Sequence, residues 1–324
     1  MKTTLTSVAA IVAASPVLAQ TPTLNVYTYD SFTSEWGPGP AIEDAFEATC
    51  GCDLVFTGAG DGAALLARLQ LEGPRTDADV VLGLDTNLTA VARDTGLFTT
   101  HGVDADLSLP VDYDDDMFLP FDWGYLAFVA DKDTPAVSSF QELADSDLSI
   151  VIQDPRSSTP GLGLLMWVQA VHGDDAGAIW EGLADNIVTV TPGWTEAYNL
   201  FLEGEADAVL SYTTSPAYHL IAEEDDTKTA WAFDEGNYLQ VEVAGILAET
   251  DQPDLAEQFM QFIVSDAFQT VIPTTNWMYP ATDIALPDGF DTLTVPKKGV
   301  LLSAAEAAAR RDDALDTWRN ALSQ

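Results

Sequence analysis

The sequence predicts an α/β fold of two lobes joined by a two-stranded hinge. Three observations support this prediction. Strand-like and helix-like segments alternate along most of the chain, two long extended runs at residues 121–129 and 238–247 interrupt that alternation, and 47% of the residues are hydrophobic, which is enough for a substantial core. Alternating strands and helices form parallel sheets that helices cover on both faces. Ligands of such sheets bind in crevices at the carboxyl ends of the strands.

The individual segments follow from hydrophobic spacing, which has period two in strands and about 3.6 in helices. Expected strands lie at residues 24–29, 53–56, 78–84, 149–152, 187–190 and 208–212. Expected helices lie at residues 40–49, 63–71, 88–95, 161–171, 194–202, 216–223, 255–271 and 303–322. The two extended runs then divide the chain. We assign residues 20–123 and 240–290 to lobe 1, residues 124–239 to lobe 2, and residues 291–324 to a C-terminal segment whose helix packs on the lobes.

The first residues are typical of an export signal. Lys2 provides a positive charge, residues 8–18 are apolar, and the small-residue pattern at residues 17–19 predicts cleavage after Ala19, with a mature N-terminus at Gln20. The alternative is an uncleaved anchor, but the apolar run is shorter than the roughly 20 residues that a membrane helix needs. We therefore expect a periplasmic protein that is not inserted in the membrane.

The charge balance is strongly acidic. Twelve Lys and Arg face 52 Asp and Glu, which gives a formal net charge of −40. Nucleic acid is excluded as a partner because its phosphates require basic side chains. The acidic runs at residues 112–116 and 223–226 are interpreted as solvated loops or helix ends rather than metal sites.

Motifs for catalysis, metal binding and cofactor binding are missing. The sequence has no G-x-S-x-G, no H-E-x-x-H and no P-loop, and its histidines, His101, His172 and His219, lie far apart. Cys50 and Cys52 are spaced C-x-C, and in an oxidising compartment we favour a small-ring disulfide between them. No metal and no cofactor is expected.

A turn at residues 153–163 is the most distinctive segment. It follows an expected strand and opens an expected helix, and it carries the hydroxyls of Ser158 and Thr159. Gly161 allows backbone N–H groups to approach an anion, and a helix N-terminus favours negative charge. The turn is either a site for a phosphate or hydroxyl group, or an ordinary N-cap formed by Ser or Thr. The residues leave both readings open.

Aromatic residues gather at the ends of the expected elements rather than within them. An aromatic-lined cleft suits a flat or cationic ligand, with each cation–π contact contributing about 0.5–2 kcal/mol; the alternative is loop packing. Asp61, Asp85 and Asp122 are the candidate acidic partners. The aromatic residues are Tyr29, Trp36, Trp194, Tyr212, Tyr218 and Trp277.

Six segments, at residues 26–32, 36–40, 78–85, 153–163, 210–219 and 272–280, resemble the periplasmic thiamine-binding proteins of thiamine ABC transporters. The resemblance spans essentially the whole mature chain, although the surface here is much more acidic. It implies a type II periplasmic-binding fold without catalysis, with thiamine or a thiamine phosphate as the ligand and the permease of an ABC importer as the partner. It implies ligand contacts at Asp61, Gly62, Ser158, Thr159, Trp194, Tyr212, Thr213, Thr214 and Ser215. Tyr29, Trp36, Tyr218 and Trp277 are expected to line the same cleft, and Ser158, Thr159 and Gly161 are expected to receive a phosphate.

Two alternatives remain. A ferric-ion-binding protein of similar fold could use Tyr212 and Tyr218 as phenolate ligands, but tyrosines in such sites are adjacent and these are not. A secreted thiamine-cleaving enzyme could use a cysteine nucleophile. Cys50 and Cys52 have no evident base nearby, and a nucleophilic cysteine needs one.

Overall fold

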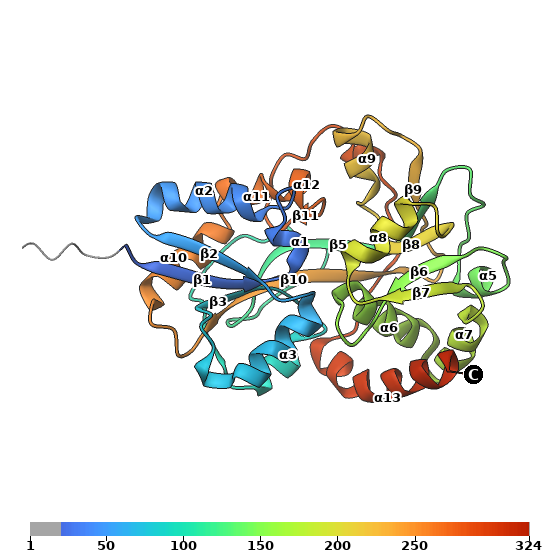
Figure 1. The fold of residues 1–324 in the computed structure, drawn as a ribbon, viewed down its shortest axis with the longest axis horizontal. Helices are drawn as coiled ribbons and strands as arrows, with labels where there is room; N and C mark the ends of the chain where they lie inside the picture. Colours follow the sequence, from blue (N-terminus) through green and yellow to red (C-terminus); the bar gives the residue numbers. More distant parts are fainter. Residues whose placement is uncertain (1–20, 324) are drawn as a thin grey trace, which may run out of the picture.

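The computed structural model describes residues 21–323, and the predicted signal segment with its cleavage after Ala19 lies outside them. The strands within this range form one continuous sheet whose main order is β2-β1-β3-β10-β5-β8-β6-β7. Figure 1 shows two lobes along the long axis, with β1, β2 and β3 in lobe 1 and β6, β7 and β8 in lobe 2. The strands are β1 (Thr23–Thr28), β2 (Asp53–Gly58), β3 (Val80–Asp85), β4 (Phe98–Thr99), β5 (Leu119–Asp131), β6 (Ile150–Gln153), β7 (Ile187–Thr191), β8 (Ala208–Tyr212), β9 (Lys228–Ala230), β10 (Asn237–Leu247), β11 (Tyr279–Pro280) and β12 (Gly299–Val300).

Helices cover both faces of the sheet in each lobe. The α-helices are α1 (Asp30–Thr33), α2 (Gly39–Cys50), α3 (Gly62–Glu72), α4 (Thr89–Asp94), α5 (Phe140–Ala144), α6 (Thr159–His172), α7 (Ala176–Leu183), α8 (Trp194–Leu202), α9 (Pro216–Ala222), α10 (Pro253–Ile263), α11 (Asp266–Gln269), α12 (Ile272–Thr275) and α13 (Ala304–Leu322). Short 3₁₀ turns occur at Gly73–Arg75, Gly173–Asp175 and Phe290–Thr292.

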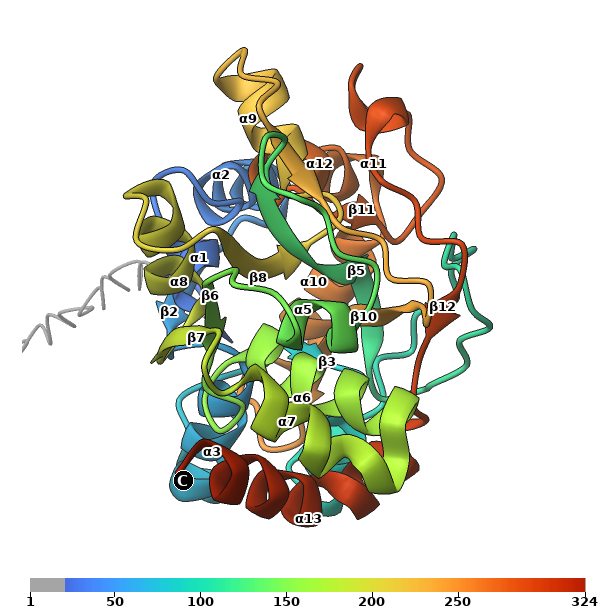
Figure 2. The ribbon, with the colours of Figure 1, turned by 90° about the vertical axis from the view of Figure 1, so that its right-hand side faces the viewer.

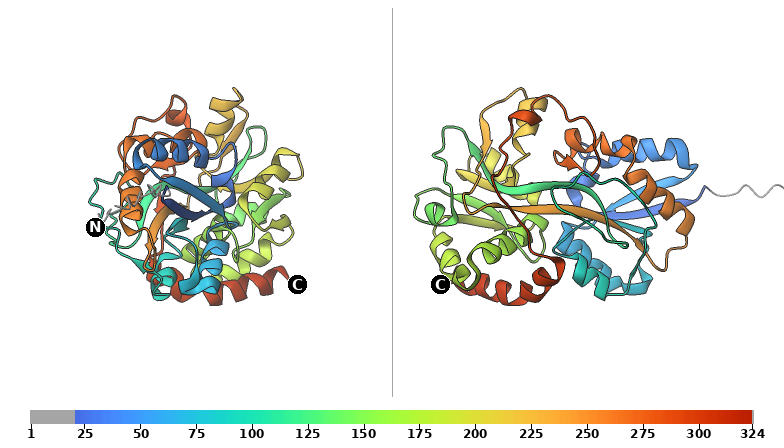
Figure 3. Two further views of the ribbon diagram at one scale, coloured as in Figure 1. Left: turned by 60° about the vertical axis from the view of Figure 1, so that its left-hand side comes forward. Right: turned by 180° about the vertical axis from the view of Figure 1, so that it is seen from behind.

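The two long extended runs form the hinge, as predicted. Strand β10 pairs antiparallel with the first half of β5, from Leu239 opposite Tyr125 to Ala244 opposite Leu119. The second half of β5 then pairs with β8 in lobe 2, beginning at Leu126 opposite Tyr212. Both strands run through the middle of the molecule in the rear view of Figure 3. The α/β, two-lobed fold with a two-stranded hinge is therefore confirmed.

Successive side chains of each strand point to opposite faces of the sheet, so hydrophobic packing forms on both faces in each lobe. In β3, Val80 and Leu82 pack with α2 and α10 on one face, whereas Val81 packs with α3 on the other. In lobe 2, Ile150 and Ile152 face α6 and α7, and Val151 faces α8. Because strands buried on both faces read as nearly continuous apolar runs, these elements were predictable from the sequence.

Helix α13 packs against α4 of lobe 1 and against α6 and α7 of lobe 2. Figure 2 shows it lying beneath α6 and α7. A capping box begins the helix, because the Ser303 side chain accepts from the Glu306 backbone N–H while the Glu306 carboxylate accepts from the Ser303 backbone N–H.

The single helix predicted at residues 255–271 is wrong. The chain forms α10 and α11 instead, with a break at Val264 and Ser265, and Ser265 adopts an extended backbone (ψ 157°) as the N-cap of α11. The break lets buried Gln269 donate to the carbonyls of Phe121 and Ile263. A side chain that satisfies buried backbone groups outweighs helical spacing here.

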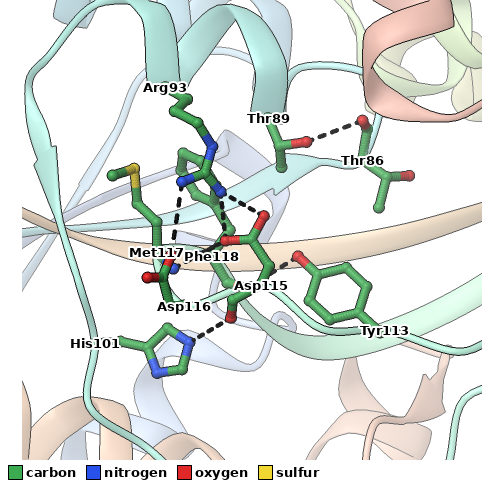
Figure 4. Close-up of polar contacts among 9 residues, drawn as sticks. All are labelled: Thr86, Thr89, Arg93, His101, Tyr113, Asp115, Asp116, Met117 and Phe118. Atoms are coloured by element: carbon green, nitrogen blue, oxygen red, sulfur yellow. Dashed lines mark hydrogen bonds and ion pairs between the residues drawn. The ribbon is translucent and has the colours of Figure 1, made fainter.

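The acidic loop ahead of β5 contains a carboxylate, that of Asp115, which stabilises the local structure. Arg93 of α4 pairs with Asp115, whose carboxylate also accepts from the backbone N–H groups of Met117 and Phe118 (Figure 4). The Asp115 carbonyl bonds to the His101 ring at 3.0 Å. The Asp115 side chain is 20% exposed, compared with 77% for Asp116. The run at residues 112–116 is a loop as expected, but one of its carboxylates anchors the start of the hinge strand.

Candidate functional site

A cavity of about 510 Å³ lies between the lobes, at the carboxyl ends of β1 and β8 and beside the hinge strand β10. This is the position expected for a ligand of an α/β sheet. Its volume falls within the roughly 300–1,000 Å³ of small-molecule sites. Its lining residues are Tyr29, Ser31, Trp36, Asp61, Thr159, Pro160, Trp194, Thr195, Tyr198, Asn199, Leu202, Tyr212, Ser215, Tyr218, Ala222, Glu242, Thr274, Thr275, Asn276, Trp277 and Met278.

Stacked rings form the lobe 2 wall of the cavity. Trp194 stacks on Tyr198 with ring centroids 4.9 Å apart, and Tyr198 stacks on His219 with centroids 5.9 Å apart. The indole N–H of Trp194 donates to the Ser211 hydroxyl at 2.8 Å. Trp36, which is 52% exposed, lies 6.3 Å from Trp194 between ring centroids. The wall is thus held in place from behind, while Trp36 reaches it from lobe 1.

A second aromatic pair meets edge to face. Tyr218 and Trp277 have centroids 5.5 Å apart at 70°. Trp277 has φ of 56°, a left-handed conformation that costs a non-glycine residue roughly 1–2 kcal/mol. Its backbone N–H donates to the Ile272 carbonyl at 3.0 Å, which helps to hold that conformation. Backbone held in an unfavourable region is typical of ligand sites.

Asp61 connects the two lobes. It precedes α3, and its Oδ2 accepts from the Ser158 hydroxyl at 2.7 Å and from the Trp194 backbone N–H at 3.1 Å. The neighbouring Gly62 N–H donates to Thr159 Oγ1 at 3.0 Å. Burial raises the pKa of Asp61 to about 6, although these two hydrogen bonds favour the ionised form. The carboxylate therefore links the two lobes through hydrogen bonds that favour its ionised form.

Gly62 is required by this close approach. A Cβ at residue 62 would lie 2.6 Å from Thr159 Oγ1 and 2.7 Å from the Gly83 carbonyl. The first contact is with lobe 2 and the second is with the backbone of β3 in lobe 1, so a side chain would have to push α3 away from both.

Two carboxyl groups lie on the hinge, and one of them, Glu242, lines the cavity. Glu242 of β10 and Asp122 of β5 are directly opposite in the strand register. The Tyr29 hydroxyl donates to Glu242 Oε2 at 2.9 Å, and Gln240 donates to Glu242 Oε1 at 2.8 Å. The Tyr212 hydroxyl donates to Gln240 Oε1 at 2.8 Å. Two of the aromatic cavity residues are therefore oriented by this polar network.

Charge in the cavity has one sign. Among the described residues that line it, Asp61 and Glu242 are acidic and none is basic. Burial raises the pKa of Asp122 to about 8, and burial together with the charge of Asp122 raises the pKa of Glu242 well above its ordinary value. Aromatic faces and carboxylates without a basic partner make a site for a flat cation.

Comparison with known proteins agrees with this geometry. A profile of the family described as bacterial extracellular solute-binding protein matches residues 38–274. The chain belongs to this family.

Similar solute-binding proteins cover nearly the whole chain. The thiamine-binding periplasmic protein of Escherichia coli K12 is 53% identical over 96% of both chains, and that of Brucella suis is 47% identical over 98% of this chain and 97% of its own. A solved periplasmic thiamin binding protein superposes with a TM-score of 0.92 at 51% identity, covering 97% of this chain and 100% of the other. A ferric binding protein from Campylobacter jejuni, with TM-score 0.74 and 18% identity over 92% and 99%, shares the fold. The relatives' names place them in the periplasm, and no helix within residues 21–323 is long and apolar enough to cross a membrane.

Most of the residues singled out in the sequence converge on the cavity of this solute-binding protein. Those that line it are Tyr29, Trp36, Asp61, Thr159, Trp194, Tyr212, Ser215, Tyr218 and Trp277. Those outside the lining are Gly62, Ser158, Gly161, Thr213 and Thr214.

Three of the residues outside the lining make contacts within the protein. Ser158 is buried and bonded to Asp61. Thr213 is buried, with its N–H bonded to the Tyr125 carbonyl. Thr214 is buried with its hydroxyl 3.8 Å from the sulfur of Met278.

Glu242, Asn276 and Tyr198 are cavity residues that sequence reasoning missed. Glu242 did leave a signal, because it is a charged residue inside the otherwise largely apolar run at residues 238–247. A buried charge without a partner is costly, so such a residue is a candidate for function.

Cys50 and Cys52 form a disulfide with Cα atoms 5.2 Å apart, between α2 and β2. Neither cysteine lines the cavity.

Proposed function

We propose that this solute-binding protein captures thiamine in the periplasm and delivers it to the permease of an ABC importer. The observation that carries the proposal is the cavity, in which stacked aromatic walls surround two carboxyl groups and no basic side chain. Thiamine offers a flat aminopyrimidine, a positively charged thiazolium ring and a hydroxyethyl arm, which match those features. Near-full-length identity of 53% to a protein named as thiamine-binding supports the same ligand.

Each predicted site residue has a role in this proposal. The rings of Tyr29, Trp36, Trp194, Tyr212, Tyr218 and Trp277 hold the two ligand rings. Asp61 places a negative charge near the thiazolium or the amino group, and Gly62 contacts the ligand beside it. Residues 213–215 close the end of β8 around the ligand. Ser158, Thr159 and Gly161, at the start of α6, receive the hydroxyl or phosphate of the arm. Thr159 supports this last role because it lines the cavity.

Gly161 has a second reason to be glycine. A Cβ at residue 161 would lie 2.6 Å from the Gln153 carbonyl oxygen. Close packing of the turn on the preceding strand is therefore sufficient to explain this residue, whether or not a phosphate binds.

Hinge closure couples ligand capture to delivery in this proposal. Residues 20–123 and 240–290 move against residues 124–239, and the permease recognises the closed form. The change of partner within β5, from β10 to β8 at residues 125–126, supports this division. A ligand shifts the equilibrium only by binding the closed form more tightly. Small-angle scattering with and without thiamine tests closure, and an unchanged radius of gyration contradicts it.

Export precedes capture. We propose that residues 1–19 are removed after Ala19, and the periplasmic relatives support this. Mass spectrometry of the protein purified from the periplasm tests the cleavage, since a mature chain that begins elsewhere than Gln20 refutes the site.

The ferric alternative is not favoured. A phenolate ligand needs a tyrosine that ionises readily, but burial raises the pKa of Tyr212 well above its ordinary value. The Tyr218 hydroxyl donates to Glu223 at 2.8 Å, and the pKa of Tyr218 is raised by this hydrogen bond. Similarity at 18% identity to a ferric binding protein supports only the fold.

We also propose that the chain binds without turning its ligand over. Its cysteines are joined in a disulfide away from the cavity, which leaves no thiolate to attack a ring. Overnight incubation of thiamine with the protein, followed by chromatography, should recover all the thiamine. Release of free pyrimidine and thiazole products would instead support the cleaving enzyme.

Titration calorimetry with thiamine, thiamine monophosphate and thiamine diphosphate tests the central proposal. We expect saturable binding of one thiamine per chain, and the two phosphates reveal whether the α6 turn accepts a negative charge. Ferric citrate serves as the control for the alternative. Binding of iron with no binding of any thiamine form would overturn the proposal.

A further inference from the structure

Two acidic side chains are paired across the hinge strands, and the fold itself does not require acidic residues there. Asp122 and Glu242 are cross-strand partners on the only two strands that run between the lobes within the described residues. Asp122 is 0% exposed and Glu242 is 6% exposed, and Glu242 lines the cavity. Two ionised carboxylates that are paired across strands and buried from solvent repel each other strongly.

The surroundings of the pair bring no compensating positive charge. The other charged groups that act on Glu242 are Asp85 at the end of β3 and Asp61 ahead of α3. Tyr29 contributes a neutral hydroxyl, and Asn276 contributes an amide that donates to Asp122 Oδ2 at 2.6 Å and to the Tyr29 oxygen at 2.9 Å. Within residues 21–323, the charge of Arg311 acts on Asp85 and lowers its pKa.

A proton completes the network. The amide of Asn276 satisfies Asp122 Oδ2, but Asp122 Oδ1 is buried and receives no donor from residues 21–323. Asp122 and Glu242 are directly opposite in the strand register, and a hydrogen bond between two carboxyl groups requires one shared proton. Burial raises the pKa of both groups, and the charge of Asp122 raises the pKa of Glu242 further.

We propose that Asp122 and Glu242 share one proton while the cavity is empty and release it to solvent when a cationic ring ligand binds, so that the pair selects cationic over neutral ring ligands. This inference rests on the proposed function for its ligand. The balance is simple: the pair changes from one negative charge to two, the ligand brings one positive charge, and one proton leaves to the solvent.

Proton release makes the affinity depend on pH. Affinity for a cation rises with pH over the range in which the pair titrates, by up to tenfold per pH unit for one proton released. Asp61 contributes to the same dependence only near its own pKa of about 6. Asp85, whose pKa is about 7, also contributes near neutral pH, so proton release at pH 7.5 is assigned to the hinge pair by comparison with the variants below.

The experiment is titration calorimetry at pH 7.5 in two buffers of different ionisation enthalpy, because the difference in apparent heat gives the number of protons released. The probes are thiamine and thiochrome, its uncharged oxidised tricycle. We expect the parent protein to release a substantial fraction of one proton with thiamine, to release none with thiochrome, and to bind thiochrome at least tenfold more weakly.

Asp122→Asn is the decisive variant. Residue 122 does not line the cavity. The asparagine amide can permanently donate the hydrogen bond that the shared proton provides in the parent. The asparagine carbonyl can still accept from Asn276. We expect this variant to release no proton and to bind thiamine with an affinity that stays constant from pH 7.5 to pH 9. Asp116→Asn, a change at a 77% exposed side chain, is the charge-matched control and should behave like the parent.

Glu242→Gln removes the other half of the pair and should abolish proton release as well; it serves as the test should Asp122→Asn fail to fold. Thiamine binding without proton release in the parent, or undiminished release in either folded variant, overturns this inference and leaves thiamine binding intact. Equal proton release with thiochrome also overturns it. Absence of thiamine binding in the parent would instead overturn the proposed function.

Discussion

Asp61→Asn is the substitution that most sharply separates ligand recognition from folding. An asparagine has nearly the same shape, and its carbonyl can accept from the Trp194 N–H. The same carbonyl oxygen, placed where Oδ2 lies, can also accept from the Ser158 hydroxyl, because Oδ2 takes both hydrogen bonds in the parent. The lobe-to-lobe hydrogen bonds therefore survive the change, and what is lost is the negative charge at the cavity wall.

The size of the effect follows from that charge. A unit charge about 5 Å from a cationic ring, at an effective dielectric constant near 20, contributes about 3 kcal/mol. Solvent at the cleft mouth reduces this, so we expect a loss of about 1.5–3 kcal/mol, or roughly 10- to 100-fold in Kd. Because burial raises the pKa of Asp61 to about 6, the parent should lose affinity as the pH falls through 6, and the variant should not show that loss.

Glu196→Gln is the matched control. Glu196 is an exposed carboxylate in the first turn of α8 whose charge acts on Asp61, so it tests the general field of the cleft rather than a direct partner. We expect less than about a threefold change in Kd, because exposed charges are screened. Calorimetry at pH 7.5, with melting curves to confirm folding, measures both variants. Equal losses in the two variants would refute a specific role for Asp61.

Three further predictions concern other parts of the molecule. Burial raises the pKa of Asp85 to about 7. The stability that the protonated carboxyl provides is therefore complete below about pH 4 and is lost as the pH rises through 7. Asp85→Asn should raise Tm at pH 8 and change it little at pH 5, as measured by melting curves. Trp194→Ala should weaken thiamine binding by roughly 30-fold or more without unfolding the protein, whereas exposed Trp36→Ala should cost less, as measured by calorimetry. Gly161→Ala should lower Tm because its Cβ would meet backbone at 2.6 Å, whereas Gly177→Ala in α7, whose Cβ would lie 3.4 Å from Thr317, should keep or raise it.

The fold was predictable because each hinge strand has a recognisable sequence pattern. Residues 121–129 and 238–247 are too long and too apolar for ordinary edge strands, and both cross between the lobes. The aromatic residues of the cavity were predictable for a related reason. Tyr212 ends a strand and Trp194 opens a helix, and the ends of α/β elements are where ligands bind.

What the sequence could not provide was contact between distant segments. Nothing local indicates that Glu242 lies opposite Asp122, because that depends on the register of two strands about 120 residues apart. Nor does the composition of the α6 turn reveal that Ser158 is occupied by Asp61 from the other lobe. The break after α10 was missed because the buried amide of Gln269, rather than hydrophobic spacing, decides it.

A crystal structure of the mature protein grown with thiamine tests the central claim most directly. We expect ligand density in the interlobe cavity, with the ligand's rings against Trp194 and Tyr212 and its positive charge facing Asp61 and Glu242. A cavity that contains only solvent at saturating thiamine, or a ligand bound elsewhere on the protein, would contradict it.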